Sequence, residues 1–447
     1  MNSRPLLKCA GIFVILIIFS AVLSMVEYKV SERQSYRDQA TQTVAKGWSH
    51  PQLIAGPVLR LSFERKYIDR KFDKELKQYV EIQKTRRWSE YRLFSNVMIN
   101  ASLEMQERYI GIFNVPVYTA KIALSAAHLA NDLRDTTHLI NAELLISIKD
   151  IRGLANQPLL AWNDQNIAFK PGTAQQLLGS YIEAPIPLTL LKSDANLKMD
   201  LNLRGVKKIG FVPTAQNLSA TLTAPWAHPS FIGNYLPSKR TVNESGFSSN
   251  WTVNSFASSI ERVLKACTKE PQQCANTLQN NQFGAHLGNS VDVYQMTDRA
   301  LKYGFMFIAL TFVVFALLEL QRRYSIHPIQ YGFVAAALAI FYLLVISLSE
   351  HIEFKIAYAI GSAVCTFLIC SYLRVALGST RVALSLSAAF VSLYTMMYAI
   401  LQSEDYAFLM GTLLVFALLA GIMFATRNIN WQQLTLQNQE QNQGDEV

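Results

Sequence analysis

Residues 303–320 read YGFMFIALTFVVFALLEL, an apolar run whose one charged residue, Glu319, stands next to its end. A helix of this length rises about 1.5 Å per residue and covers the roughly 30 Å hydrocarbon core of a bilayer. A helix also satisfies its backbone hydrogen bonds within the segment, as lipid requires. The stretch therefore predicts a transmembrane helix.

Five further apolar runs have a similar length. They lie at residues 10–26, 331–348, 356–373, 382–401 and 406–425. The first follows Arg4 and Lys8 like a signal peptide, but it is longer than a usual signal core and no A-x-A cleavage site follows it. We expect six transmembrane helices, namely an uncleaved anchor at 10–26 and a five-helix bundle within 302–425.

Basic residues near short connections predict the orientation, because Lys and Arg are retained on the cytoplasmic side. The basic clusters are Arg4 with Lys8, Arg322 with Arg323, Arg374 with Arg381, and Arg427. Six crossings place all of them on one side. Residues 1–9 and the tail 426–447 are thus predicted to be cytoplasmic, and 27–301 to lie on the opposite, outer side of the membrane. The tail is polar and of low complexity, which predicts disorder.

The link SEHIEFK, residues 349–355, falls on the outer side. Its plainest interpretation is a hairpin tip where water solvates the charges. Glu350 and His351 are nevertheless candidate functional residues, because a histidine between carboxylates is suited to a pH-sensing role.

The interiors of the six runs contain no charged residue. Ion-coupled transporters, proton pumps and intramembrane proteases depend on such groups within the membrane. The bundle therefore predicts packing and anchoring. Transport or handling of a lipid-like molecule, which needs fewer charges, remains the alternative.

The segment 27–301 alternates polar and apolar residues with period two, for example in SNVMINASLEM (95–105), NLKMDLNLRGV (196–206) and LSATLTA (218–224). Such alternation is typical of half-buried strands. It predicts a large, mainly antiparallel β domain of sandwich type, so the whole chain is predicted to be an α+β membrane protein.

Two helices are also expected in this segment. Residues 28–46 extend the first anchor as a polar helix. A second helix is predicted from Ser255, with that serine as its N-cap and with Phe256, Ile260 and Leu264 on one face.

The region Arg60–Arg92 contains eleven basic and six acidic residues. An ordinary solvated sheet surface or a long hairpin explains it most simply. The alternative is a basic face that meets an anionic lipid or polymer outside the membrane, where no nucleic acid is expected.

Cys267 and Cys274 lie close together in ACTKEPQQCAN. Outside the cytoplasm they can form a short-loop disulfide, and two free thiols are the alternative. No His/Cys pair at finger spacing accompanies them, so we expect no metal.

The sequence contains no P-loop, no G-x-S-x-G, no H-E-x-x-H and no paired CxxC. We therefore expect neither an enzyme nor a cofactor. His228 in WAHPSF and Glu244 in NESGF could form a catalytic set acting on an envelope polymer. Polar residues beside Pro and Gly, however, more often form turns.

Several short motifs occur in a fixed order along the chain. They are WAHPSFIGNYLPSKR (226–240), NESGF (243–247), YQMTDRALKYGFMFIALTF (294–312), IHPIQY (326–331), LSEH (348–351) and TRNINW (426–431). Together they resemble the CreD family. The resemblance implies a Gram-negative inner-membrane protein with a large periplasmic domain, which supports envelope integrity and stress tolerance under a two-component regulator. It implies no catalytic residues.

Asp298 and Arg299 belong to the third of these motifs, just before the second predicted span. We expect them to cap that helix or to pair with one another, and a ligand site is the alternative. The partners expected for the chain are the lipid bilayer and an envelope component or periplasmic protein. No oligomeric state follows from the sequence.

Overall fold

The computed structural model describes residues 3–73, 78–130, 137–172, 180–267, 271–288, 293–320, 327–403 and 407–427. The chain divides into two compact units. One consists of Met1–Arg37 with Val291–Val447, and the other is Asp38–Ser290.

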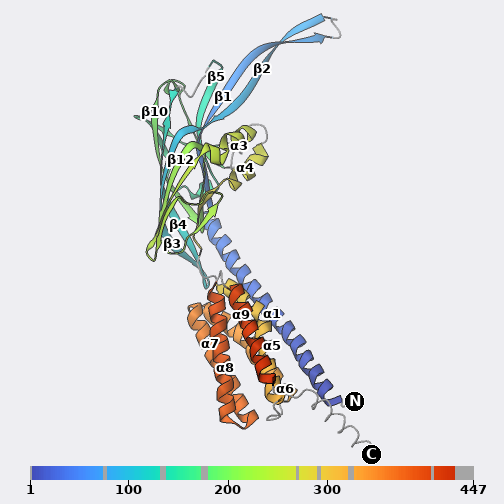
Figure 1. The fold of residues 1–447 in the computed structure, drawn as a ribbon. Coiled ribbons are helices and arrows are strands. Elements are labelled where there is room, and N and C mark those ends of the chain that lie inside the picture. Colours follow the sequence, from blue (N-terminus) through green and yellow to red (C-terminus); the bar gives the residue numbers. More distant parts are fainter. Residues whose placement is uncertain are drawn as a thin grey trace, which may run out of the picture. The chain divides into compact units, whose positions relative to one another are not determined.

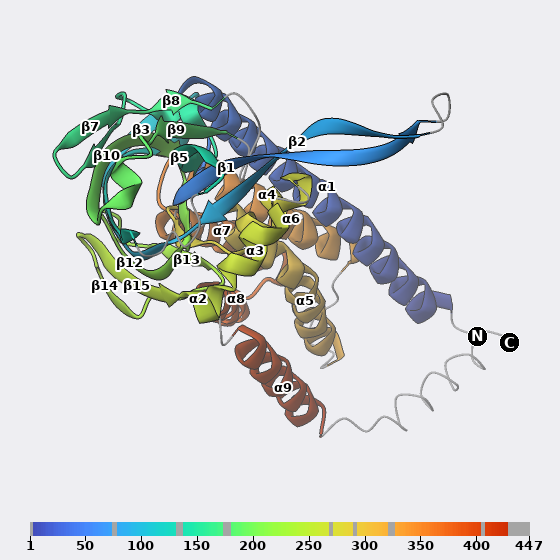
Figure 2. The ribbon, with the colours of Figure 1, turned by 90° about the horizontal axis from the view of Figure 1, so that it is seen from above.

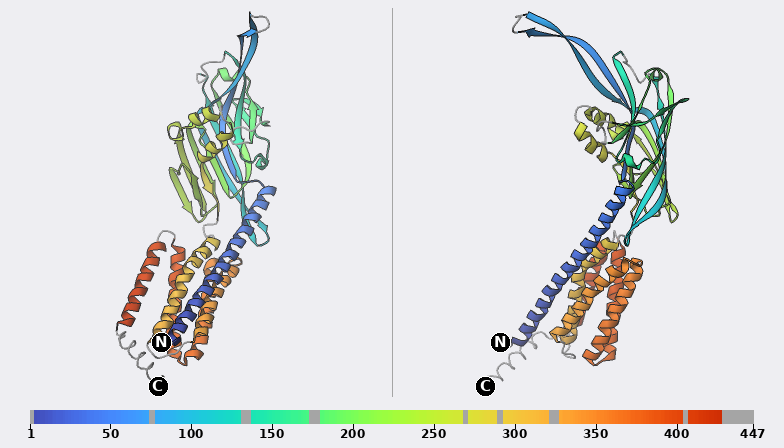
Figure 3. Two further views of the ribbon diagram at one scale, coloured as in Figure 1. Left: turned by 90° about the vertical axis from the view of Figure 1, so that its right-hand side faces the viewer. Right: turned by 180° about the vertical axis from the view of Figure 1, so that it is seen from behind.

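The first unit is helical (Figures 1 and 3). Its helices are α1 (Ser3–Gly47, of which Met1–Arg37 holds the first part), α5 (Val293–Leu320), α6 (Pro328–Ser349), α7 (Phe354–Leu377), α8 (Thr380–Gln402) and α9 (Ala407–Thr426). In the sequence, α5 to α9 follow one another, and α6 packs on α7 and α7 on α8. Short links join neighbouring helices, as in other helix bundles.

Among the described residues, four helices are long and apolar enough to cross a membrane: Phe13–Gly47, Pro328–Ser349, Phe354–Val375 and Thr380–Gln402. Each overlaps one of the six expected spans. Helices also form at the other two, as α5 and α9, and α9 includes a shorter apolar stretch at Leu409–Gly421. Four spans are thus supported, and the total of six stays a prediction.

Local signals explain where α6 begins. Pro328 occupies the first turn, where its missing N–H costs nothing. The His327 side chain accepts a hydrogen bond from the Ile329 N–H, and the Gln330 side chain accepts one from the His327 N–H. These reciprocal bonds form a capping box, which fixes the helix start within the IHPIQY motif.

The second unit contains two sheets of eight strands each. Sheet A has the order β13-β16-β11-β1-β5-β9-β8, with β2 paired to β1. Its strands are β1 (Gln52–Asp73), β2 (Gln78–Arg92), β5 (Leu139–Ile148), β8 (Lys170–Pro171), β9 (Tyr181–Pro185), β11 (Lys208–Val212), β13 (Ser230–Gly233) and β16 (Phe283–His286).

Sheet B has the order β14-β15-β12-β3-β4-β10-β6-β7. Its strands are β3 (Phe94–Ile110), β4 (Phe113–His128), β6 (Leu159–Trp162), β7 (Gln165–Ala168), β10 (Ala195–Val206), β12 (Ala215–Ala224), β14 (Lys239–Asn243) and β15 (Gly246–Asn254). Both sheets are mixed, because β1 runs parallel to β11 and β12 runs parallel to β3. The expected α+β class is confirmed, and the parallel pairs refine the expectation of an antiparallel domain.

One core lies between the sheets, whose strands surround it in the view of Figure 2. In β10 the residues Leu197, Met199, Leu201 and Leu203 are buried, while their neighbours face outward. The period-two pattern of the sequence thus identified the inward face correctly. Trp251 of β15 contacts Phe283 of β16, with ring centroids 5.4 Å apart, and so links sheet B to sheet A.

The end of α1 packs on the sandwich. Within this unit, Ala45 lies in a small cluster with Val115, Val117 and Val206, and Trp48 packs against it. The Trp48 ring also lies near two guanidinium groups, 4.9 Å from that of Arg108 and 4.8 Å from that of Arg204. The helix expected at 28–46 is therefore confirmed.

The helix expected from Ser255 is interrupted. It forms as α2 (Ser255–Ser258) and α3 (Ile260–Cys267), because Ser259 adopts a left-handed conformation with φ 50°. Asn254, not Ser255, is the N-cap, since its side chain accepts from the Ala257 N–H. The break also takes Phe256 off the buried face, so it is 95% exposed whereas Ile260 and Leu264 are buried.

Candidate functional site

His228 and Glu244 are both exposed parts of connecting segments. His228 lies between β12 and β13. Glu244 lies in the β14–β15 turn, where the Asn243 side chain accepts from the N–H groups of Ser245 and Gly246. Within the described residues, no hydrogen bond or ion pair joins His228 to Glu244. The turn-forming interpretation therefore suits NESGF better than catalysis.

Asp298 and Arg299 lie inside α5 and not before it, because the helix begins at Val293. The Asp298 carboxylate pairs with Lys302 one turn later, at 2.8 Å. Asp298 is therefore not the N-cap that the sequence suggested.

Glu350 does not lie in a solvated tip as expected. Its side chain is only 8% exposed, at the C-terminal end of α6. It accepts a hydrogen bond from the Tyr294 hydroxyl of α5 at 3.2 Å and lies 3.5 Å from Nε of Arg33 in α1. The carboxylate thus joins three helices of the helical unit. His351, the next residue, is exposed.

Tyr294 completes this cluster. The Arg37 guanidinium lies 5.1 Å from the centre of its ring. Burial, and then the charge of Glu350, raises the pKa of Tyr294 to about 12. The hydroxyl therefore stays neutral and donates to Glu350 at physiological pH. The cluster holds helix ends together and has no feature that points to chemistry.

Cys267 and Cys274 lie in α3 and α4 (Pro271–Asn280). Their side chains lie outside the described residues, so the disulfide stays a prediction. Among the described residues, no three His, Cys, Asp or Glu side chains come together as metal ligands.

The β1–β2 hairpin is the first candidate interaction site. β5 pairs with β1 only as far as Phe63, whereas β2 continues to pair with β1 as far as Asp73. Residues 64–73 and 78–87, here called the ribbon, therefore extend beyond the sheet as two strands (Figures 1 and 3). At about 3.3 Å per residue, the ribbon reaches roughly 30 Å.

The ribbon carries excess positive charge. Arg65 lies directly opposite Arg86, a like-charge arrangement that destabilises a strand pair. These two and Lys66 have no ion-pair partner among the described side chains. The remaining described cations pair across the strands, namely Arg70 with Glu81, Lys84 with Asp69, and Arg87 with Glu64.

The ribbon also exposes four large side chains, Tyr67, Ile68, Tyr79 and Ile82, of which Tyr79 is 71% exposed. Cations beside exposed aromatic and aliphatic groups are typical of segments that bind an anionic membrane surface. The sequence indicated the charge of this region but not that it leaves the domain as an isolated arm.

A second candidate site is a groove of about 340 Å³ between α7 and α8. Lys355 lies at its α7 end, and Ser362 and Thr366 follow on the same helix. The Thr366 hydroxyl is buried and has no hydrogen-bond partner in the described part of the chain. A buried hydroxyl without a partner is costly, so a ligand group that bonded to it would be stabilised.

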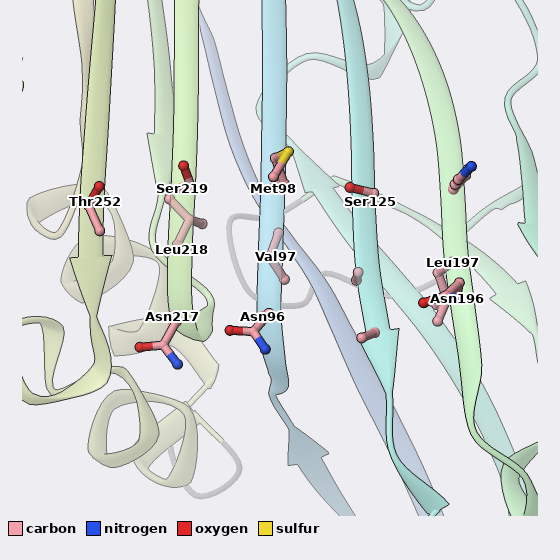
Figure 4. A pocket seen from close by; sticks show the side chains of 13 residues that line it. Asn96, Val97, Met98, Ser125, Asn196, Leu197, Asn217, Leu218, Ser219 and Thr252 are labelled. Atoms are coloured by element: carbon pink, nitrogen blue, oxygen red, sulfur yellow. The ribbon is translucent and has the colours of Figure 1, made fainter. Parts of the chain in front are cut away.

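A third candidate site is a groove of about 600 Å³ on the outward face of sheet B (Figure 4). Five neighbouring strands, from β15 to β10, form its floor. Asn96, Met98, Ser125 and Asn217 are among its lining residues. No sequence pattern indicated this groove, because the period-two alternation of these strands identifies only which residues are buried.

Comparisons with known proteins cover almost the whole chain. The family model described as "Inner membrane protein CreD" matches residues 4–432. The inner membrane protein CreD of Escherichia coli (strain K12) is 30% identical over 442 residues, which are 98% of this chain and 96% of that protein.

Two crystal structures of an M1 zinc metallopeptidase from Deinococcus radiodurans were also found. They are 9% and 10% identical to this chain, and each match covers 36% of it and 38% of the other chain. The TM-score is 0.18 in both cases. At that value neither likeness bears on fold or chemistry.

Proposed function

Because this chain belongs to the CreD family of inner membrane proteins, we propose that it supports the integrity of the cell envelope by binding an anionic envelope component through the ribbon. The sheet domain lies on the periplasmic side in this proposal, with both termini in the cytoplasm. The protein acts as a binding protein and not as an enzyme.

One observation carries the proposal: the ribbon leaves the sandwich with three cations that have no ion-pair partner among the described side chains, and with four exposed aromatic or aliphatic side chains. A like-charge pair such as Arg65 and Arg86 destabilises the ribbon itself. A surface of anionic lipid headgroups would remove that repulsion and would also accept the exposed tyrosine and isoleucine side chains. We therefore identify the bound component as an anionic lipid surface.

A vesicle assay tests this proposal on the full chain in zwitterionic nanodiscs. We expect it to float with vesicles that contain phosphatidylglycerol and not with pure phosphatidylcholine vesicles. The variant R65Q/K66Q/R86Q should bind about a hundredfold more weakly, because each cation near such a surface contributes about 1 kcal/mol. High salt should weaken wild-type binding as well, since it screens the charges.

The matched control is K170Q/K192Q/K239Q, which removes three exposed lysines from the sandwich and leaves the ribbon unchanged. It should bind the anionic vesicles like the wild type. Cells that lack the protein should regain detergent resistance with the control variant but not with the ribbon variant. Equal vesicle binding by both variants would contradict the proposal.

The groove between α7 and α8 favours a second candidate function, the handling of a lipid-like molecule by the helical unit. Three small hydroxyl side chains line this groove among alanine, valine and tyrosine residues, namely Ser362, Thr366 and Thr395, and Lys355 supplies a cation at one end. Such a groove fits a lipid with a polar headgroup. The five helices after the sheet domain also exceed what anchoring requires.

Filling this groove is the direct test. In the variant S362L/T366L the groove is blocked, so we expect less lipid to remain bound after purification, as measured by mass spectrometry. S371L adds the same side chain at an exposed position of α7 outside the groove and should leave the bound lipid unchanged. Lipid content that is equal in all three proteins would exclude this function.

A further inference from the structure

The outward face of sheet B has an unusual composition for a β-sheet. In register, Asn254 of β15 lies next to Asn217 of β12, which lies next to Asn96 of β3. Ala127 of β4 continues this row, and Asn196 of β10 ends it. The row therefore places asparagine on four of five adjacent strands.

The next row along the strands is also polar and uncharged at most positions. It contains Thr252, Ser219, Met98, Ser125 and Lys198, in the order of the strands. With the exception of Asn254, the residues of both rows line the third groove, of about 600 Å³. Of the described residues that line it, Lys198 alone is charged, and the half-exposed Met98 is at its centre (Figure 4).

Structural roles account for only two of the four asparagines. Asparagine is depleted in strands, where β-branched and aromatic residues pack better. Asn254 has a structural role as the cap of α2, and Asn217 donates to the Ser95 carbonyl. The side chains of Asn96 and Asn196 make no hydrogen bond to the described protein groups. Residues with a low propensity for the secondary structure in which they lie are expected where a surface serves binding.

The face restricts the kind of ligand. The backbone groups of the central strands are already paired in the ladders, so a ligand must bond to side chains rather than extend the sheet. A single lysine in the groove gives little attraction for a polyanion. The small polar side chains also lack the aromatic anchors of a typical protein interface.

What remains is a neutral ligand rich in hydroxyl and amide groups. Each asparagine amide presents two hydrogen-bond donors and an acceptor, and each Ser or Thr hydroxyl can both donate and accept a hydrogen bond. The exposed Met98 offers an apolar contact for C–H groups. We propose that this face, here called the polar face, binds an uncharged polysaccharide strand that carries acetamido groups. The proposal concerns a different surface from the ribbon and does not depend on it.

Isothermal titration of the full chain in nanodiscs with the N-acetylglucosamine hexamer tests the proposal. We expect measurable binding of this probe and weaker binding of cellohexaose, which lacks acetamido groups. N96A/N196A should bind the hexamer about tenfold more weakly, because two hydrogen bonds are lost. N166A removes an exposed asparagine on β7, outside the groove, and should bind like the wild type.

The changed side chains are exposed, so the variants should fold, and hydrogen exchange of β3 and β10 at the wild-type rate verifies that they do. Absence of hexamer binding by the wild type, with vesicle binding intact, would overturn the polar-face proposal and leave the ribbon proposal standing. Equal hexamer affinity of N96A/N196A and the wild type would also overturn it.

Discussion

Replacing Trp251 by alanine is expected to lower the free energy of unfolding of the sheet domain by about 3–5 kcal/mol. The side chain is 1% exposed and contacts Phe283 and Phe231 of sheet A with ring centroids 5.4 and 5.9 Å away. Its indole N–H also donates to the Tyr235 carbonyl at 3.1 Å. The change leaves a large cavity where the two sheets meet.

Hydrogen exchange of the full chain, followed by mass spectrometry, measures this effect locally. Amides of β12 and β15 should exchange about two to three orders of magnitude faster in W251A. W251F keeps an aromatic ring but loses the indole hydrogen bond, so it should cost about 1–3 kcal/mol. F256A removes a 95% exposed ring and should change stability by less than about 0.5 kcal/mol.

Similar exchange rates in W251A and F256A would contradict the arrangement of the core, because they would mean that Trp251 contributes no more than a surface residue. Slower exchange in either variant is not expected, since neither change adds a contact.

Replacing Arg60 by alanine is the second large effect, and we expect a loss of about 3–5 kcal/mol. The guanidinium donates to Glu143 at 2.7 Å and to Glu183 at 3.0 Å. The three side chains are 12%, 13% and 23% exposed. Without Arg60, two poorly solvated carboxylates remain close together with no cation between them.

The matched control replaces Arg60 and both glutamates by neutral residues. R60M/E143Q/E183Q removes all three charges and keeps similar volumes, so it should be much closer to the wild type than R60A. Hydrogen exchange of β5 and β9 reports the effect in each variant. A triple variant that is less stable than R60A would show that the ion pairs themselves, and not an unpaired charge, govern stability here.

The sequence predicted the inward faces of the strands but not their partners. Alternation in β3, β10 and β12 identified Val97, Leu197 and Leu218 as buried, because period two follows directly from the pleat. The parallel pairing of β12 with β3 joins segments that are more than a hundred residues apart. No local pattern encodes such a partner.

Site prediction met the same limit. Glu350 looked like a solvated charge because its neighbours in sequence are polar, whereas its burial results from Arg33 and Tyr294 on other helices. The polar face was not detected, because outward residues of a strand are interpreted as solvent-facing by default. The ribbon was indicated by its charge, since excess cations can be counted in the sequence.

β1 is both a central strand of sheet A and one side of the ribbon. A pull on the ribbon tip therefore acts along the axis of β1, and its hydrogen bonds to β5 and β11 bear the tension in shear. Bonds loaded together in shear resist more force than bonds opened one at a time by peeling. If the surface that we propose the ribbon binds were to move away, the tension would reach the domain through an inner strand of sheet A rather than through its edge.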